Sequence, residues 1–164
     1  FEAVREAARL VLAPLERAGI HAGLMTTGSR GLHVTIPVRP EHDHDRVRAV
    51  ARAFAERLAE AHPDRLTVAA RKAKRGERLY LDVMRVGLGQ TGVAPYSLRA
   101  RPGAPVATPI TRAELDDPAL DARRWNHETV RERLARTGDP WKGLDRHAVR
   151  LDTLAEALGV EEER

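Results

Sequence analysis

Apolar residues recur along this chain with two different periods, and the order of these periods constrains the fold. In residues 1–18 and 45–61 they recur at helical spacing, with Gly19 after the first stretch and Pro63 after the second. Between these stretches, residues 32–38 alternate apolar and polar side chains, which is typical of a strand with one buried face. A helix, a strand and a second helix are therefore predicted in this order.

The two-residue period predicts two further strands, at residues 79–84 and 93–101. His33, Asp82 and Arg99 each fall on the polar phase of one of the three predicted strands. If the strands share a sheet, one face packs on the helices and the other presents an imidazole, a carboxylate and a guanidinium. The alternative is a solvated face that carries these side chains by chance, and alternation alone favours that alternative.

The second half of the chain has a different pattern, with a proline-containing segment followed by predicted helices. Residues 102–109 contain three prolines, which predicts an extended surface loop. Helices are predicted at 111–115, 128–136 and 144–158, followed by a charged tail at 161–164. The expected fold is one α/β domain of the α+β kind over residues 1–164. It has a mainly antiparallel sheet, helices on one face, an open cleft on the other and a helical C-terminal extension.

The charge balance favours a polyanionic partner. Lys and Arg number 28 against 24 Asp and Glu, and the pI is about 10.1. A GC-rich genome would produce the same excess of arginine without functional meaning. The sequence has no cysteine, which excludes disulfides and thiolate metal sites. It also has no bilayer-length apolar run and no signal-peptide pattern, so we expect a soluble, cytoplasmic protein without a membrane partner.

A turn before the first predicted strand has the composition of a phosphate-binding loop. Residues 26–31 read Thr-Thr-Gly-Ser-Arg-Gly, so hydroxyls, a basic side chain and two glycines let backbone amides close around phosphate oxygens. The Gly-Lys-Ser/Thr spacing of a Walker A loop is absent, and a hairpin turn would also contain glycines. The turn leads directly into the strand that carries His33, which strengthens the case for an active site on that face.

Two stretches give the pattern a specific resemblance. Residues 27–34, Thr-Gly-Ser-Arg-Gly-Leu-His-Val, resemble the second motif of the archaeo-eukaryotic primase superfamily. Residues 81–85, Leu-Asp-Val-Met-Arg, and the long stretch 89–109 are similar to the third motif and its continuation in the primase-like polymerase domain of bacterial ligase D. The resemblance continues through residues 114–115 and covers most of the chain.

The resemblance implies an activity and a set of site residues. Family members are DNA polymerases of the primase type that bind nucleoside triphosphates and a divalent metal, Mn or Mg. They often favour ribonucleotides and fill gaps at broken DNA ends in end joining, with a ligase domain or an end-binding repair protein as partners. By position, Asp82 would be a catalytic metal ligand and His33 a catalytic residue. The implied nucleotide-binding residues are Thr27, Arg30, His33 and Arg99, with Arg75 and Arg85 in second rank.

One departure from the family pattern bears on activity. Phosphoryl transfer needs two metals held by carboxylates, and a single aspartate cannot hold both. The family supplies the missing pair from an Asp-x-Asp motif shortly before a helix like residues 1–18, and no such pair lies in a suitable strand upstream of Asp82 here. We therefore expect the C-terminal two-thirds of a polymerase domain, inactive as this fragment alone. The alternative is a degenerate relative without metal chemistry. Smaller departures are Thr27 in place of Ser and Val86 in place of Asn.

Other candidate residues have simpler interpretations. The His-Asp-His-Asp run at 42–45 could bind a metal, but Asp43 or Asp45 capping the second helix explains it better. The basic run at 71–75 could follow a phosphate backbone or be a solvated loop. Trp125 and Trp141 are expected in core or helix-docking positions.

Two other functions remain open from the sequence. The chain could be a non-catalytic module that holds nucleotides or DNA ends for a repair partner. It could also be a different triphosphate-using enzyme on the same kind of sheet. An Asp-x-Asp motif before Phe1 would favour the polymerase over the module, and a primer that keeps its length in an incorporation assay would indicate the different enzyme.

Overall fold

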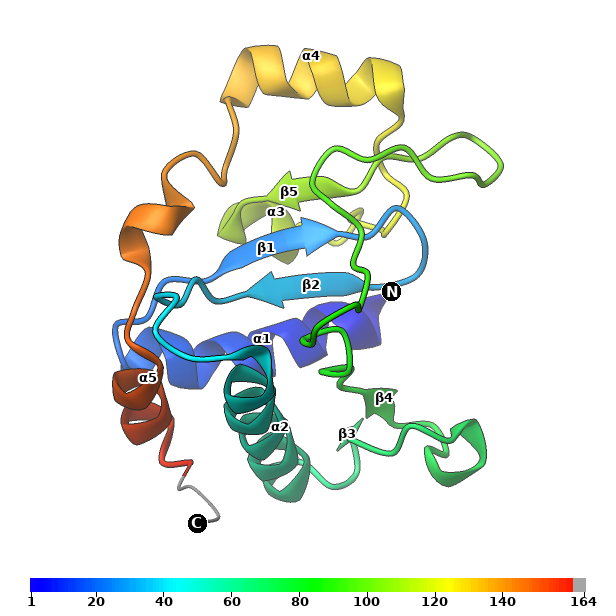
Figure 1. Ribbon diagram of the computed structural model, residues 1–164. Coiled ribbons are helices and arrows are strands. Elements are labelled where there is room, and N and C mark those ends of the chain that lie inside the picture. The colour runs from blue at the N-terminus through cyan, green and yellow to red at the C-terminus, as the bar shows by residue number, and fades with distance from the viewer. Residues whose placement is uncertain (161–164) are drawn as a thin grey trace.

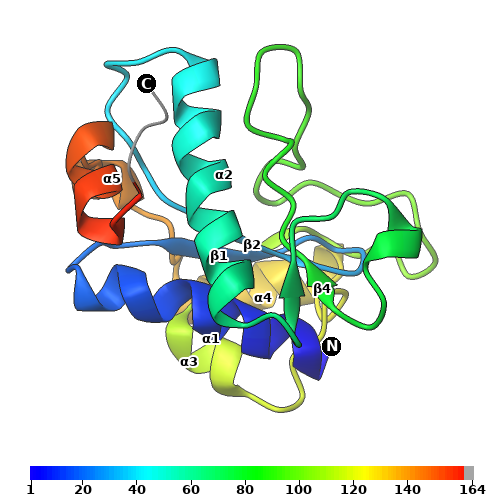
Figure 2. The same cartoon turned by 90° about the horizontal axis from the view of Figure 1, so that it is seen from below.

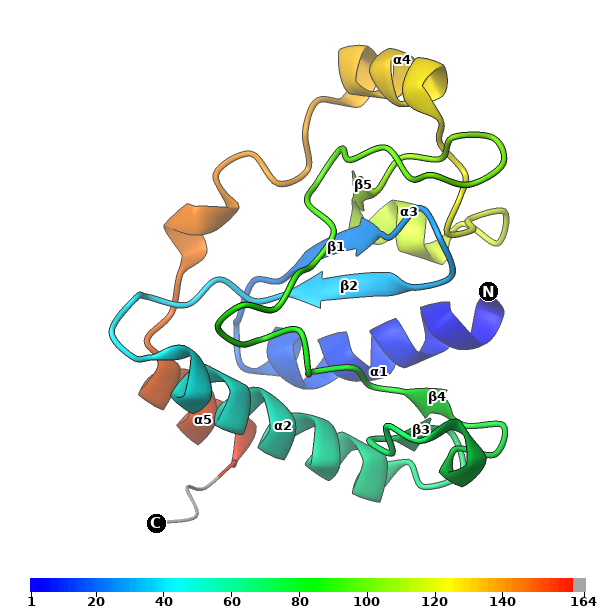
Figure 3. The ribbon, with the colours of Figure 1, turned by 45° about the vertical axis from the view of Figure 1, so that its right-hand side comes forward.

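The computed structural model describes residues 1–160, and the predicted charged tail lies outside them. Figures 1 and 3 both place the main sheet between α4 and α2. In chain order the elements are α1 (Glu2–Arg17), β1 (Gly23–Thr26), β2 (Leu32–Thr35), α2 (His44–Ala61), β3 (Leu66–Thr67), the 3-10 turn η1 (Lys72–Lys74), β4 (Leu79–Tyr80), β5 (Thr108–Ile110), α3 (Arg112–Asp116), α4 (His127–Thr137), the 3-10 turn η2 (Leu144–His147) and α5 (Leu151–Leu158).

The main sheet has three strands in the order β2-β1-β5, and β1 is antiparallel to both neighbours. Met25 lies opposite His33 on one side and Pro109 on the other, so the three residues share one face. Leu24 is on the opposite face and packs in one apolar cluster with Leu12 of α1. The expected antiparallel sheet with helices is therefore confirmed, and His33 is on the face away from α1.

The apolar interior forms two clusters that share α1. One joins α1 to α2 and α5 through residues such as Leu15, Phe54 and Leu154. The other joins α1 to the main sheet, α3 and α4, and includes Trp125, which is 7% exposed. The core position expected for Trp125 is confirmed.

The expectation that all predicted strands share one sheet is wrong. β4 pairs in parallel with β3 in a separate two-stranded sheet, and it ends at Tyr80, before Asp82. Residues 93–101 are a loop that makes one isolated bridge, between Leu98 and Val106. Tyr96 interrupts any strand there because its φ of +63° lies in the left-handed region.

Two predictions for the second half are also corrected. The surface loop predicted at 102–109 is exposed only at its start, because residues 105–110 are buried and end in β5. Pro109 is tolerated there because β5 is an edge strand. The helix predicted at 144–158 is divided into η2 and α5, since Val149 is extended and forms a bridge with Val38.

The start of α2 explains the His-Asp-His-Asp run. The Asp43 side chain accepts a hydrogen bond from the Arg46 amide at 2.8 Å, which confirms the capping interpretation. His42 Nε2 lies 3.4 Å from a carboxylate oxygen of Asp152 in the first turn of α5. Among the helices of residues 1–160, none has the length and apolar character to cross a membrane.

Candidate functional site

The turn between β1 and β2 is closed by Thr27. Its amide donates to the Gly31 carbonyl at 3.0 Å, and its hydroxyl donates to the same oxygen at 3.1 Å. The hydroxyl oxygen also accepts hydrogen bonds from the amides of Ser29, at 3.3 Å, and Gly31, at 3.2 Å. The structure therefore uses Thr27 to shape the turn. Its contact with a triphosphate stays a prediction, as does that of Arg30, which is exposed at the tip.

Gly28 lets the stem of Arg99 lie across this turn. Its φ is +65°, and an added Cβ would come within 2.6 Å of Arg99 Cγ and 3.1 Å of the Ala107 amide nitrogen. A side chain at position 28 would thus displace Arg99 or strain the turn. Arg123 holds the turn from another direction by donating to the Ser29 carbonyl at 3.0 Å.

Asp82 and Arg99 both lie within electrostatic range of His33, although the three residues arise from different kinds of element. Burial lowers the pKa of His33 below its usual 6.5, the charge of Arg99 lowers it further, and the charge of Asp82 raises it. Both charges therefore lie within electrostatic range of the imidazole. His33 is on β2, Asp82 follows β4, and Arg99 is in the loop that leads toward β5.

Asp82 is exposed and ordered by local contacts. One carboxylate oxygen accepts a hydrogen bond from the Met84 amide at 3.0 Å, and the other lies 4.0 Å from Arg85 Nε. Figure 2 shows the loop after β4 extending alongside α2, and an added Cβ at Gly87 would lie 3.1 Å from Arg48 Nη1. Because its Nε is 4.0 Å from Asp82, Arg85 lies next to the cluster formed by His33, Asp82 and Arg99.

Sequence reasoning did not select Tyr80 as a site residue. Burial raises its pKa, and the charge and hydrogen bonding of Asp82 raise it further, so its hydroxyl is close to that carboxylate. The Arg75 guanidinium lies 4.0 Å from the Tyr80 ring centroid and donates to the carbonyls of Ala69 and Ala70 at 2.9 and 2.5 Å. Arg75 thus joins the cluster through Tyr80. The available signal was that Tyr80 shares the polar phase of Asp82.

The described residues do not fit a divalent metal by themselves. Within residues 1–160, no group of three or more His, Asp or Glu side chains is arranged to hold one. Asp82 is the carboxylate of the cluster, and one of its oxygens already accepts a hydrogen bond. The assignment of Asp82 as a metal ligand therefore stays a prediction.

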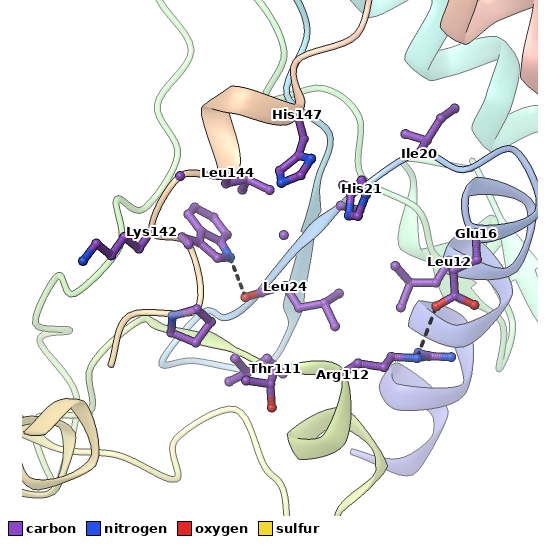
Figure 4. Close-up of a pocket in the computed structure, with 16 residues that line it drawn as sticks. Leu12, Glu16, Ile20, His21, Leu24, Thr111, Arg112, Lys142, Leu144 and His147 are labelled. Atoms are coloured by element: carbon purple, nitrogen blue, oxygen red, sulfur yellow. Dashed lines mark hydrogen bonds and ion pairs between the residues drawn. The ribbon is translucent and has the colours of Figure 1, made fainter. Parts of the chain in front are cut away.

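Two cavities lie elsewhere in the molecule. One of about 410 Å³ is lined by α1, the start of β1 and the segment before and within η2, where the rings of His21 and His147 are 4.1 Å apart (Figure 4). The other, of about 580 Å³, lies between α1, α2 and α5. None of the predicted site residues lines either cavity.

Titration of His33 tests this geometry in the 164-residue chain. We expect its pKa, followed by NMR, to lie below 6.5, to fall further in Asp82→Asn and to rise in Arg99→Ala, because each substitution removes one neighbouring charge. His44 is exposed at the start of α2 and serves as an internal control. If neither substitution changes the pKa of His33, Asp82 and Arg99 do not lie close to the imidazole.

Comparison with known proteins supports the resemblance to the ligase D polymerase domain along most of the chain. Residues 1–141 match the family model described as LigD, primase-polymerase domain. The multifunctional non-homologous end joining protein LigD of Pseudomonas aeruginosa is 36% identical over 138 residues, which are 83% of this chain and 16% of that protein. The LigD repair protein of Mycobacterium tuberculosis is 37% identical over 149 residues, 91% of this chain and 19% of that protein.

A solved structure agrees with the sequence matches. The polymerase domain of Mycobacterium tuberculosis ligase D, solved in complex with DNA, superposes with a TM-score of 0.81 at 36% identity. The match covers 90% of this chain and 50% of that one. The chain thus spans about half of the solved domain and less than a fifth of the two LigD proteins. By both sequence and fold, this chain belongs to the LigD primase-polymerase domain family.

Proposed function

We propose that this chain contributes to template-directed nucleotidyl transfer, adding nucleotides, including ribonucleotides, to primer or broken DNA ends in non-homologous end joining. The observation that supports this proposal is that Asp82 and Arg99 both lie within electrostatic range of His33, while the Arg99 stem lies across the turn at residues 27–31. Transfer of a nucleotidyl group depends on positioning and on cations at the triphosphate oxygens, and a cluster of this composition suits both needs.

Each residue has a distinct part in the proposed site. The Arg99 stem is fixed across the turn, so its guanidinium is held ready to donate two parallel hydrogen bonds to phosphate oxygens. His33 has a lowered pKa, so near neutral pH it binds as a neutral imidazole with one N–H donor. Arg85 adds a second, exposed cation next to Asp82.

Asp82 is proposed as one ligand of a divalent metal, Mn or Mg, that would neutralise charge on the triphosphate. The carboxylate is exposed and carries no strong ion pair, since Arg85 Nε is 4.0 Å away. Residues 1–160 do not complete such a site. We therefore propose that further ligands come from the substrate or from outside these residues.

DNA is the proposed macromolecular partner. The solved relative is described in complex with DNA. In this chain, Arg71, Lys72 and Lys74 are exposed in the basic segment beside β4, where they can contact a phosphate backbone. We expect binding to weaken as salt is raised, as it does when phosphate contacts dominate.

Incorporation of a labelled ribonucleotide on gapped DNA with manganese tests the proposed function. The assay is run with the 164-residue chain and with the complete product of its gene. We expect the complete product to lengthen the primer and the 164-residue chain to bind without extension. A primer of unchanged length with both, despite DNA binding, would favour the non-catalytic module.

Arg99→Ala is expected to weaken binding of ATP by about tenfold to a hundredfold, since a hydrogen bond between charged groups contributes about 1.5–3 kcal/mol. Calorimetric titration of the 164-residue chain with ATP and Mg²⁺ measures the loss. Arg101→Ala is the matched control, because Arg101 is an exposed arginine two residues away. If the two variants bind ATP with equal affinity, Arg99 does not contact the nucleotide.

A further inference from the structure

Tyr96 has a backbone conformation that the surrounding structure must hold. Within residues 1–160, only Tyr96 and Ala104 have a positive φ without being glycine, and for Tyr96 the value is +63°. A bulky side chain in this region is strained, and such strain persists where several contacts fix it. The first contact is its own amide, which donates to the Ala107 carbonyl at 2.7 Å.

The second contact ties Tyr96 to the segment after α4. Its hydroxyl donates to an Asp139 carboxylate oxygen at 2.5 Å, across 43 residues of sequence. The ring packs against the apolar cluster shared by α1 and the main sheet. Burial, followed by the hydrogen bond to Asp139, raises the pKa of Tyr96, so the phenol remains a donor.

Asp139 is itself anchored to the main sheet. The oxygen that accepts from Tyr96 also accepts from the Trp141 amide at 2.9 Å. The Trp141 indole N–H donates to the Leu24 carbonyl of β1 at 3.0 Å, the dashed line at Leu24 in Figure 4. An added Cβ at Gly23 would come within 2.7 Å of Trp141 Nε1, so the indole lies directly on β1. Asp139 thus connects the Tyr96 loop to the central strand.

The chain from Tyr96 to Arg99 has little freedom once Tyr96 is fixed. The Ala107 amide donates to the Ser97 carbonyl at 2.9 Å, and the Arg99 amide donates to the Pro105 carbonyl at 2.8 Å. Three residues after Tyr96, the Arg99 stem therefore arrives across Gly28. A change in the Tyr96 conformation would be transmitted to the Arg99 side chain.

We propose that the hydrogen bond between Tyr96 and Asp139 positions Arg99 over the turn at residues 27–31, so that Tyr96 and Asp139 are positioning residues of the nucleotide site. The role in nucleotide binding rests on the proposed function. It gives the segment after α4 a part in triphosphate affinity, although Tyr96 and Asp139 themselves do not touch the nucleotide. The effect on the geometry of Arg99 can be measured without any nucleotide.

Tyr96→Phe in the 164-residue chain removes the donor and keeps the ring. We expect about a fivefold loss of ATP affinity in calorimetry with Mg²⁺, the effect of one hydrogen bond transmitted through the loop. In the Arg99→Ala background the same substitution should cause no further loss, because its effect acts through Arg99. An equal loss in both backgrounds would overturn the positioning role.

Substitutions at Asp139 separate the hydrogen bond from the charge. Asp139→Ala should lose affinity as Tyr96→Phe does, whereas Asp139→Asn keeps an acceptor oxygen and should retain most of it. Asp145→Ala, at an exposed position in η2, is the matched control. If Asp139→Asn loses as much affinity as Asp139→Ala, charge rather than the hydrogen bond is responsible, and the proposal is wrong.

Hydrogen exchange distinguishes failure of the inference from failure of the proposed function. In Tyr96→Phe we expect faster exchange of the Arg99 and Ala107 amides, with protection of the Met25 amide in β1 unchanged. Unchanged exchange at Arg99 would overturn the inference even if ATP binds. Wild-type protein that binds no ATP would instead overturn the proposed function, and faster exchange at Arg99 would still support the positioning contact.

Discussion

Replacing Asp82 with asparagine is expected to abolish nucleotide incorporation by the complete gene product while changing DNA affinity by less than about twofold. Asparagine keeps the oxygen that accepts from the Met84 amide, so the loop retains its shape. The negative charge, which the proposed metal site requires, is lost. If Asp82 binds the proposed metal, its loss should remove catalysis, whereas the proposed phosphate contacts with DNA do not involve this carboxylate. Primer extension on gapped DNA measures the first effect, and fluorescence anisotropy measures the second.

Asp64→Asn is the matched control for this experiment. Asp64 is an exposed aspartate in the turn after α2, outside the cluster of His33 and Asp82. It should incorporate nucleotides as the wild type does. Full activity of Asp82→Asn would show that the metal assignment is wrong, and equal loss in both variants would indicate a general effect of charge.

Glu114→Ala is expected to lower the free energy of unfolding by about 3 kcal/mol, because it leaves a buried cation without its ion-pair partner. Arg133 is 2% exposed and donates to both oxygens of Glu114, at 2.6 and 2.5 Å. Its remaining Nη1 has no hydrogen-bond partner within the described residues, although the guanidinium carbon lies 5.1 Å from the Trp125 ring centroid. Loss of the capping box between Thr111 and Glu114 adds to the effect.

Urea denaturation of the 164-residue chain measures this loss, with Glu132→Ala as control because Glu132 is exposed on the same helix as Arg133. A change below about 1 kcal/mol in Glu114→Ala would mean that the ion pair contributes little, as exposed pairs do.

The same pair predicts a dependence of stability on pH. Burial raises the pKa of Glu114, but hydrogen bonds from Arg133 and Thr111 outweigh burial, so the pKa lies below its usual 4.5. The folded state therefore binds this proton less readily than the unfolded state. The stabilisation is present above pH 4.5 and is lost as the pH falls through the lower, folded value. Glu114→Gln should lack this part of the acid dependence.

The helices were the part of the fold that the sequence predicted best. α1 and α2 have long apolar stripes with a clear end or cap, and Asp43 was identifiable as a cap from residue type and place. Short strands carry less information. The central strand β1 has four buried residues, so it shows no alternation and was not assigned. β5 contains Pro109. A proline favours a loop assignment unless the strand is known to lie at the edge of a sheet.

The site shows where pattern reasoning reaches its limit. The polar phase selected both His33 and Asp82, and Asp82 lies within electrostatic range of His33, but not through a shared sheet, because β2 and β4 belong to different sheets. Arg99 reaches the same place from a loop, through tertiary contacts with Gly28 and Pro105. Such contacts join residues far apart in the sequence and leave no local periodicity. The partnership of Tyr96 with Asp139 could not be predicted for the same reason.

The order of strands in the main sheet has a consequence for biosynthesis. β1 and β2 form a local hairpin, whereas β5 pairs with β1 at a sequence separation of 82, between Thr26 and Thr108. Closing so long a loop is slow compared with closing the hairpin. A nascent chain leaving the ribosome can form the hairpin early, but the loop that carries Arg99 becomes fixed only after β5 emerges. Asp139, which holds the Arg99 loop through Tyr96, emerges later still, so competence to bind nucleotide should arise late in translation, after closure of the sheet.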